Sequence, residues 1–225
     1  MALWRRQRRY EGGMYVTKYH KISTLFKRDP ATKMKTLIMG EYTTPEFEYL
    51  RDCQWVFTEK VDGTNVRVVC QDGTFEFKGR TDNAQMPAPL MERLRERFLP
   101  QAHRLAEKFP DGVCLYGEGY GAKIQSGGKY RPDQDFVLFD VKVGEWWLER
   151  QSVEDIADEF GLDVVPIIGY GTFGDMVKMV EQGFKSQWGN FIAEGIVARP
   201  EVELKTRSGE RIITKLKHID FKTGW

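Results

Sequence analysis

The chain has 225 residues, of which 41% are hydrophobic, so it is long enough to bury a core as one large domain or two small ones. Its 34 basic and 33 acidic residues leave a formal charge of +1, which excludes strong attraction of the whole chain to nucleic acid and requires any basic surface to be local. The cysteines, Cys53, Cys70 and Cys114, lack metal-binding spacing and predict free thiols in a reducing, cytosol-like compartment. Because the sequence contains no run of eighteen apolar residues, we expect no membrane span.

The first half of the chain alternates turn signals with strand and helix patterns. Residues 43–52 predict a short helix, with a Thr cap and a Pro in its first turn, that leads into a strand at Trp55–Glu59. Asp72 and Gly73 between two β-rich runs predict a hairpin. Apolar residues at helical spacing on both sides of Pro100 predict two helical segments. The sheet is therefore at least partly antiparallel.

The second half continues this mixture of strands and helices. The stretches 112–120 and 135–149 have strand character, and the second turns at Gly144. Residues 152–161 predict a helix with a Ser152/Asp155 capping arrangement and Gly161 as its stop. A helix at 172–183 and strands around 194–200 and 211–221 complete the pattern. No linker separates two cores, so we expect a single α+β domain over residues 1–225, with antiparallel β-sheets and flanking helices.

A lysine stands where the strand Trp55–Glu59 ends in a tight turn. Lys60 is followed by Asp62 and Gly63, and a lysine placed this way can be held rigidly with its amine in a cleft. An ordinary strand-edge lysine explains the same pattern equally well, because short turns with Asp and Gly are common. The lysine turn indicates a functional site only together with the other motifs of the chain.

Polar residues interrupt three further apolar stretches in the same way. Glu118 and Glu194 each lie in an otherwise apolar strand next to glycine. Lys215 and Lys217 are two residues apart, so in a strand both point to one face while Leu216 points to the other. Two lysines on one face favour an anion as their partner.

Together these residues resemble the covalent nucleotidyltransferase superfamily of ATP-dependent polynucleotide ligases and mRNA capping enzymes. The hallmarks of that superfamily are a K-x-D-G turn, an acidic residue in a Y/F-G-E strand, an aromatic strand before F-D, an E-G strand and a final K-x-K. They stand here in that order, over about residues 58–217, as Lys60-Val61-Asp62-Gly63, Tyr116-Gly117-Glu118, "FVLFD" at 136–140, Glu194-Gly195 and Lys215-Leu216-Lys217. The five motifs in this order are specific to the superfamily, whereas each motif alone is not.

Within the superfamily the chain is most similar to phage-type RNA ligases that seal nicks in duplex RNA. The similarity lies in "EKVDGTN" followed by "GRTDN", since capping enzymes and DNA ligases more usually show arginine where Asn65 stands. Two departures are that those RNA ligases often carry histidine at the position of Asp62, and that only eight residues follow Lys217. We therefore expect a ligase-type adenylyltransferase domain with a nucleotide cleft and no separate C-terminal oligonucleotide-binding or helical domain.

The resemblance implies an ATP-dependent RNA ligase that joins 5′-phosphate and 3′-OH ends. Lys60 would attack the α-phosphate of ATP to form a lysyl-AMP, and the AMP would then pass to a 5′-phosphate before the 3′-OH displaces it. The lysine amine must first lose its proton, because the ordinary pKa of lysine is about 10.4. Neighbouring positive charge from Lys215, Lys217 and a bound Mg²⁺ ion, or Mn²⁺ in its place, would favour the neutral amine.

The resemblance also implies a role for each site residue. Lys60, Asp62, Lys215 and Lys217 form the catalytic set, in which Asp62 assists the lysine or organises its turn and the other two lysines neutralise the α-phosphate. The nucleotide would contact Lys60, Lys215 and Lys217 together with Glu59, Asn65 (also a candidate for the 5′-phosphate), Arg80 (ribose or a substrate phosphate), Glu118 (ribose hydroxyls), Phe139 (stacking on adenine) and Glu194 (the carboxylate nearest the metal). Phe136 is the fallback for the adenine stack, although strand alternation points it the other way.

Other interpretations stay open at this point. An ATP-dependent DNA ligase core is the nearest rival, because RNA is told from DNA by a 2′-OH contact that the sequence does not locate. An inactive protein that binds nucleic-acid ends is disfavoured, because every chemical position holds a competent residue. The "GGKYRP" stretch, with Lys129 and Arg131, either lines the phosphate path or forms a solvated turn.

The expected partners follow from the same resemblance. They are nicked or duplex RNA and no membrane, with a protein partner that would supply substrate binding if the domain does not suffice alone. The oligomeric state is left open, and the expected location is the cytoplasm, that of the host if the protein comes from a phage.

Overall fold

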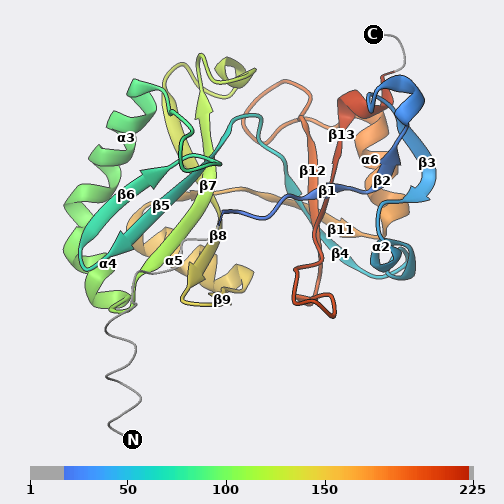
Figure 1. Cartoon of the computed structure of the whole chain (residues 1–225). Coiled ribbons are helices and arrows are strands. Elements are labelled where there is room, and N and C mark those ends of the chain that lie inside the picture. Colours follow the sequence, from blue (N-terminus) through green and yellow to red (C-terminus); the bar gives the residue numbers. More distant parts are fainter. Residues whose placement is uncertain (1–17, 223–225) are drawn as a thin grey trace, which may run out of the picture. The chain divides into compact units, whose positions relative to one another are not determined.

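The computed structural model describes residues 18–222, which form two compact units that share the chain in alternating segments (Figure 1). Of the described residues, the first unit holds Lys18 and Tyr19 together with Thr64–Gly119 and Gln134–Asp163. The second holds His20–Gly63, Tyr120–Asp133 and residues 164–222. The chain thus passes from the second unit to the first directly after Gly63, at the end of the lysine turn. The mixed α+β class is confirmed, whereas the single-domain organisation stays a prediction.

The second unit is built on a five-stranded sheet, counted over residues 18–222, in the order β1-β13-β12-β4-β11. Strands β12 and β4 pair antiparallel, as do β12 and β13, while β1 and β13 pair parallel. A separate ladder joins β2 to β3. The elements are β1 Ser23–Thr24, β2 Phe26–Arg28, η1 Pro30–Thr32, β3 Leu37–Tyr42, α2 Pro45–Tyr49, β4 Trp55–Glu59, η3 Gly127–Lys129, β11 Ile167–Gly171, α6 Phe173–Gln182, β12 Gly195–Pro200, β13 Thr214–Lys217 and η4 His218–Phe221.

Strand β4 shows why this unit folds as the sequence predicts. Trp55, Phe57 and Glu59 are buried and alternate with half-buried residues, as expected for a strand with one face on a core. The ring of Trp55 lies 4.1 Å from that of Phe173, the first residue of α6. Helix α6 begins with a capping box in which Thr172 and Asp175 satisfy each other's backbone N–H groups. The predicted strand 55–59 and helix 172–183 are confirmed.

The first unit is built on a sheet in the order β10-β8-β7-β5-β6, with β9 beside β8. The predicted hairpin is confirmed: Asp72 and Gly73 have φ of 50° and 72°, as a two-residue turn that follows the strand twist requires. Pro100 separates two helices, as predicted. The elements are β5 Thr64–Gln71, β6 Thr74–Lys78, α3 Ala88–Phe98, η2 Leu99–Gln101, α4 Ala102–Lys108, β7 Val113–Gly121, β8 Gln134–Val143, β9 Trp146–Trp147, α5 Arg150–Phe160 and β10 Asp163–Val164.

Two predicted details are wrong. Helix α5 begins at Arg150 rather than at a Ser152 cap, and its N-cap Glu149 makes no side-chain capping bond. The extra turn is stabilised by an ion pair of 2.6 Å between Arg150 and Glu154, which stand one helical turn apart. The strand expected at 211–221 is shorter, because a 3₁₀ turn, η4, follows Lys217.

The expectations drawn from composition can also be compared with the structure. Cys70 and Cys114 are buried and Cys53 is exposed, and all three carry free thiols, as predicted. Burial raises the pKa of the Cys114 thiol to about 11. Within residues 18–222 no helix is both long enough and apolar enough to cross a membrane.

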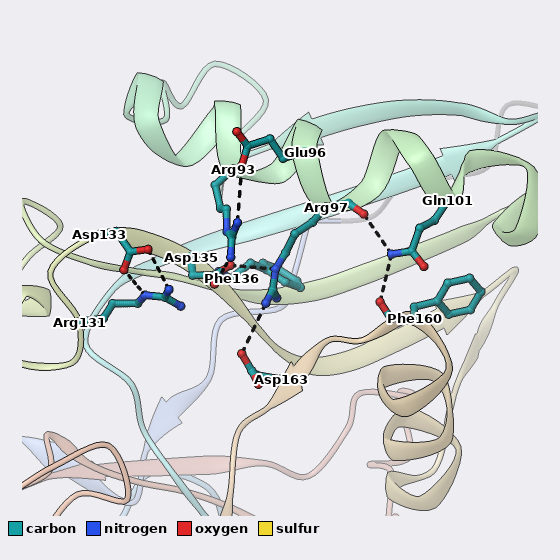
Figure 2. A network of polar contacts seen from close by, with 10 residues as sticks. All are labelled: Arg93, Glu96, Arg97, Gln101, Arg131, Asp133, Asp135, Phe136, Phe160 and Asp163. Carbon is teal, nitrogen blue, oxygen red and sulfur yellow. Dashed lines mark hydrogen bonds and ion pairs between the residues drawn. The ribbon is translucent and has the colours of Figure 1, made fainter.

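A buried carboxylate ties helix α3 to strand β8 in the first unit (Figure 2). The side chain of Asp135 is only 1% exposed and lies between two arginines of α3, with Arg93 Nη2 at 3.3 Å and Arg97 Nε at 3.2 Å. Just beyond this helix, the side-chain amide of Gln101 in η2 donates to the Arg97 carbonyl of α3 and to the Phe160 carbonyl of α5, each at 3.0 Å. Because a buried charge is tolerated only when it is paired, Asp135 should contribute strongly to the stability of this unit.

We predict that Asp135→Asn lowers the free energy of unfolding by about 3 kcal/mol, because two arginines lose the carboxylate that pairs with them. Asp133→Asn is the matched control, since Asp133 pairs with Arg131 at 2.6 Å but is 61% exposed. That change should cost less than about 1 kcal/mol. Urea denaturation of the two variants measures both values, and equal losses would contradict the role given to Asp135.

Candidate functional site

The strand order of the second unit brings three of the predicted site residues together. Lys60 directly follows β4, Glu194 directly precedes β12, and Lys217 ends β13, with β12 lying between the other two strands. The backbone N–H of Lys60 donates to the Gly195 carbonyl at 2.9 Å, and Gly195 pairs with Lys217 across the next ladder. All three side chains therefore start from the same end of one sheet.

The carboxylate of Glu194 bridges the two lysines. Lys60 Nζ donates to its Oε2 and Lys217 Nζ to its Oε1, each at 2.6 Å. The side chains of Lys60 and Glu194 are only 20% and 12% exposed, so this contact is partly shielded from water. Burial lowers the pKa of Lys217, but the ion pair with Glu194 outweighs burial and the pKa is raised overall. The bridge thus favours the ammonium form of Lys217.

Lys215 lies on the same side of β13 as Lys217, one pleat away, and Leu216 between them is fully buried. The prediction that both lysines share a face is confirmed. The direct partner of the Lys60 amine is nevertheless a carboxylate, whereas sequence reasoning placed positive charge beside it and assigned Glu194 to a metal. No group of three or more potential metal-ligating side chains occurs among the residues that the structure describes.

Gly195 is required by the close approach of β13. A Cβ atom at this position would lie 2.1 Å from the Leu216 carbonyl oxygen and 2.8 Å from Lys217 Cα. Because both contacts are with backbone, no side-chain movement can relieve them. The glycine therefore lets Glu194 and Lys217 approach each other from adjacent strands.

The turn after Lys60 is held by a segment that sequence reasoning did not connect with it. The backbone N–H of Asp62 donates to the Tyr130 hydroxyl at 3.2 Å, and Asp62 Oδ2 accepts from the backbone N–H of Ser126 at 3.2 Å. Tyr130 is buried, and burial raises the pKa of its hydroxyl. Tyr130 lies within the "GGKYRP" stretch, in which the sequence indicated only Lys129 and Arg131 as candidate site residues. Of the two predicted roles of Asp62, these contacts favour the organising one.

The charged neighbours of Tyr130 make contacts of their own. Lys129 Nζ lies over the ring of Phe191 at 4.9 Å, and Arg131 pairs with Asp133. Both side chains thus have partners within the second unit, and a role in the phosphate path stays a prediction.

Glu59 precedes the lysine and is a buried acid. Its side chain is 1% exposed; Oε2 accepts from the backbone N–H of Gln187 at 2.8 Å, whereas Oε1 has no hydrogen-bond partner among the described residues. Burial raises the pKa of Glu59, although hydrogen bonds from Gln187 and Ser186 act in the opposite direction. A buried polar atom without a protein partner calls for an explanation, such as an ordered water, an ion or a catalytic role.

Two predicted nucleotide-binding residues stand opposite each other in the first unit. Glu118 of β7 pairs with Asn65 of β5, so both side chains lie on one face of that sheet. Asn65 Oδ1 is buried and has no hydrogen-bond partner among residues 18–222. Arg80, which follows β6, is exposed.

The two phenylalanines that the sequence offered for stacking on adenine both lie on β8 of the same sheet. Phe139 of β8 is half-buried, with its ring 5.0 Å from that of Tyr19. Phe136 is fully buried against Phe98 of α3, at 5.7 Å between ring centres. The two phenylalanines therefore differ in surroundings as strand alternation predicts, while stacking on adenine stays a prediction.

We predict that Glu59→Gln stabilises the protein increasingly as pH rises. Since the pKa of Glu59 is raised in the folded state, the unfolded state loses its proton first, and wild-type stability falls as pH rises above the usual value of 4.5. A glutamine has no such loss, so the variant should match the wild type at pH 3 to 4 and exceed it at pH 7. Glu181→Gln, an exposed position of α6, is the control and should show no such trend in thermal unfolding.

Comparisons with known proteins place this geometry in context. A family model described as RNA ligase matches residues 53–217, which include the lysine turn, Glu194 and Lys217. A comparison with curated protein sequences finds no match. The match of the family model therefore carries the assignment of the chain to a family.

Solved structures of RNA ligase from Naegleria gruberi share the fold. A variant with ATP and Mn has a TM-score of 0.65 at 19% identity, over 91% of this chain and 56% of that one. A second variant, apo, gives 0.62 at 17% identity over 93% and 59%, and the ligase with PPi gives 0.60 at 22% over 88% and 61%. This chain thus spans less than two thirds of the length of these relatives. Because the family model covers more than half of the chain, the chain belongs to the RNA ligase family.

Proposed function

We propose that this protein is an ATP-dependent RNA ligase that joins a 5′-phosphate to a 3′-OH through a covalent lysyl-AMP and an adenylated 5′ end. Membership of the RNA ligase family supports the reaction class. The observation that carries the proposal is the convergence of Lys60, Glu194 and Lys217 at one end of a single sheet. A rigid lysine beside a second lysine suits a nucleophile that attacks a phosphate.

In the first step the neutral Nζ of Lys60 attacks the α-phosphorus of ATP. The new N–P bond forms as the bond to the β-phosphate oxygen breaks; pyrophosphate leaves with that electron pair, and the amine proton passes to solvent. Lys217 and Lys215, on one side of β13, neutralise charge on the phosphate. The AMP then passes to a 5′-phosphate, and a 3′-OH attacks the adenylated end to release AMP.

Glu194 fits the role of a carboxylate that binds Mg²⁺ or Mn²⁺. Magnesium is commonly held by one or two carboxylates while phosphates and water fill its other positions, so one well-placed carboxylate suffices. A bound divalent ion would draw Glu194 away from Lys60 and stabilise the leaving pyrophosphate. The ATP and Mn in a related ligase structure support this choice of cofactors.

We propose nicked or duplex RNA as the substrate and a cytosol-like location, consistent with the three free thiols. The nucleotide-binding roles of Glu118, Phe139, Asn65 and Arg80 in the first unit remain predictions, as does a protein partner for end binding.

We predict that Lys60→Ala abolishes covalent labelling by ATP that carries its label in the α-phosphate. Wild-type protein incubated with this ATP and Mg²⁺ should keep the label after denaturation, because the phosphoramidate bond is covalent. Lys178→Ala, at an exposed position of α6 in the same unit, is the matched control and should label like the wild type. Unlabelled wild-type protein, or a labelled Lys60→Ala variant, would refute the proposed nucleophile.

The substrate class is tested separately. Nicked duplexes that carry ribose or deoxyribose on each side of the break should be sealed only where ribose is present, since the 2′-OH distinguishes RNA from DNA. Equal sealing of all-DNA nicks would favour a DNA ligase core, and labelling without any sealing would favour a need for a partner.

A further inference from the structure

Four aromatic residues of the second unit pack together next to the lysine turn. We refer to these residues, Tyr120, Tyr130, Trp188 and Phe191, as the aromatic brace. The ring of Tyr130 lies 4.9 Å from that of Phe191, 5.7 Å from that of Trp188 and 6.0 Å from that of Tyr120, in each case edge to face. Such edge-to-face contacts contribute attraction beyond simple burial. Tyr130 is therefore fixed from three sides.

The brace is connected to the lysine turn at two points. On one side the Tyr130 hydroxyl accepts the backbone N–H of Asp62. On the other side Gln187, next to Trp188 of the brace, donates its backbone N–H to the Glu59 carboxylate. Lys60 thus lies between Glu59 and Asp62 in the chain, and each of these two residues is hydrogen-bonded to a segment that carries brace residues.

The segment before Tyr130 adds a third connection and is itself tightly built. Ser126 donates its backbone N–H to the Asp62 carboxylate. Nearby, Lys123 and Gln125 adopt φ of 67° and 47°, a conformation that costs energy for residues other than glycine and persists only where the surroundings enforce it. A Cβ on Gly127 would lie 2.3 Å from the Gly121 carbonyl oxygen, so the loop closes tightly on itself. The loop is suited to hold Asp62 in one place.

We propose that Tyr130 is a positioning residue for the nucleophile: through its hydrogen bond to Asp62 and its packing in the aromatic brace, it fixes the direction in which Lys60 presents its amine. This inference rests on the proposed function. A small misplacement of a reacting atom can cost up to about a hundredfold in rate, so a residue that fixes the turn can act on catalysis without touching the nucleotide.

The test compares Tyr130→Phe with wild-type protein in single-turnover formation of lysyl-AMP over a range of ATP concentrations. Loss of one orienting hydrogen bond should lower the maximal rate about tenfold. The ATP concentration that gives half of that rate should stay within about twofold, since the nucleotide loses no contact. Tyr42→Phe, whose ring packs against Phe26 at 5.2 Å in the same unit, is the matched control and should leave both quantities unchanged.

A second readout separates positioning from general damage to the fold. Joining of an RNA strand supplied with an already adenylated 5′ end needs no attack by Lys60, so Tyr130→Phe should perform it at the wild-type rate. Phe191→Leu keeps the hydroxyl but loosens the brace, and it should lower the maximal adenylation rate a few-fold with the same unchanged half-saturating ATP concentration.

The outcomes distinguish the two proposals. Wild-type protein that forms no lysyl-AMP overturns the proposed function. If the wild type reacts and Tyr130→Phe reacts equally fast, the positioning role is wrong. It is also wrong if Tyr130→Phe weakens ATP binding as strongly as it slows adenylation, or if it slows the joining of adenylated ends to the same extent, because those patterns indicate a merely structural tyrosine.

Discussion

The carboxylate of Glu194, held between the ammonium groups of Lys60 and Lys217, is the contact on which the site depends. Three charges in a partly shielded place are stable only while each has its partner, and removal of one leaves the others uncompensated. The three residues stand at the ends of three neighbouring strands. They meet only because β12 pairs with both β4 and β13 in the observed register. A slip of one residue in either ladder would turn the side chains of the shifted strand to the opposite face.

This contact also fixes the position of the Lys60 side chain. The hydrogen bond of 2.6 Å from Lys60 Nζ to Glu194 Oε2 keeps the lysine side chain in place. The same carboxylate is the natural ligand for a hard cation. Under the proposed function, Glu194 would both position Lys60 and hold the divalent ion that accompanies ATP.

The sequence predicted the parts of the site that are local and missed those that depend on topology. The lysine turn, Glu194 beside Gly195 and the two lysines on one face of β13 were found, because each is a short pattern with its own conformational reason. The direct pairing of Lys60 with Glu194 was missed, because no local pattern states that β12 lies between β4 and β13. Tyr130 was missed for a related reason: its hydroxyl meets Asp62 through folding of a loop whose sequence shows no periodicity.

The alternation of the two units along the chain has a consequence for synthesis on the ribosome. Strand β4 emerges early, but its sheet neighbours β11 and β12 begin only at Ile167 and Gly195. Most of the first unit can acquire its own pairing before those strands exist, since Thr64–Gly119 and Gln134–Asp163 come first. Nucleation by such distant pairing is slow. The surroundings of Lys60 are therefore completed late, after the strands of the first unit have been synthesised.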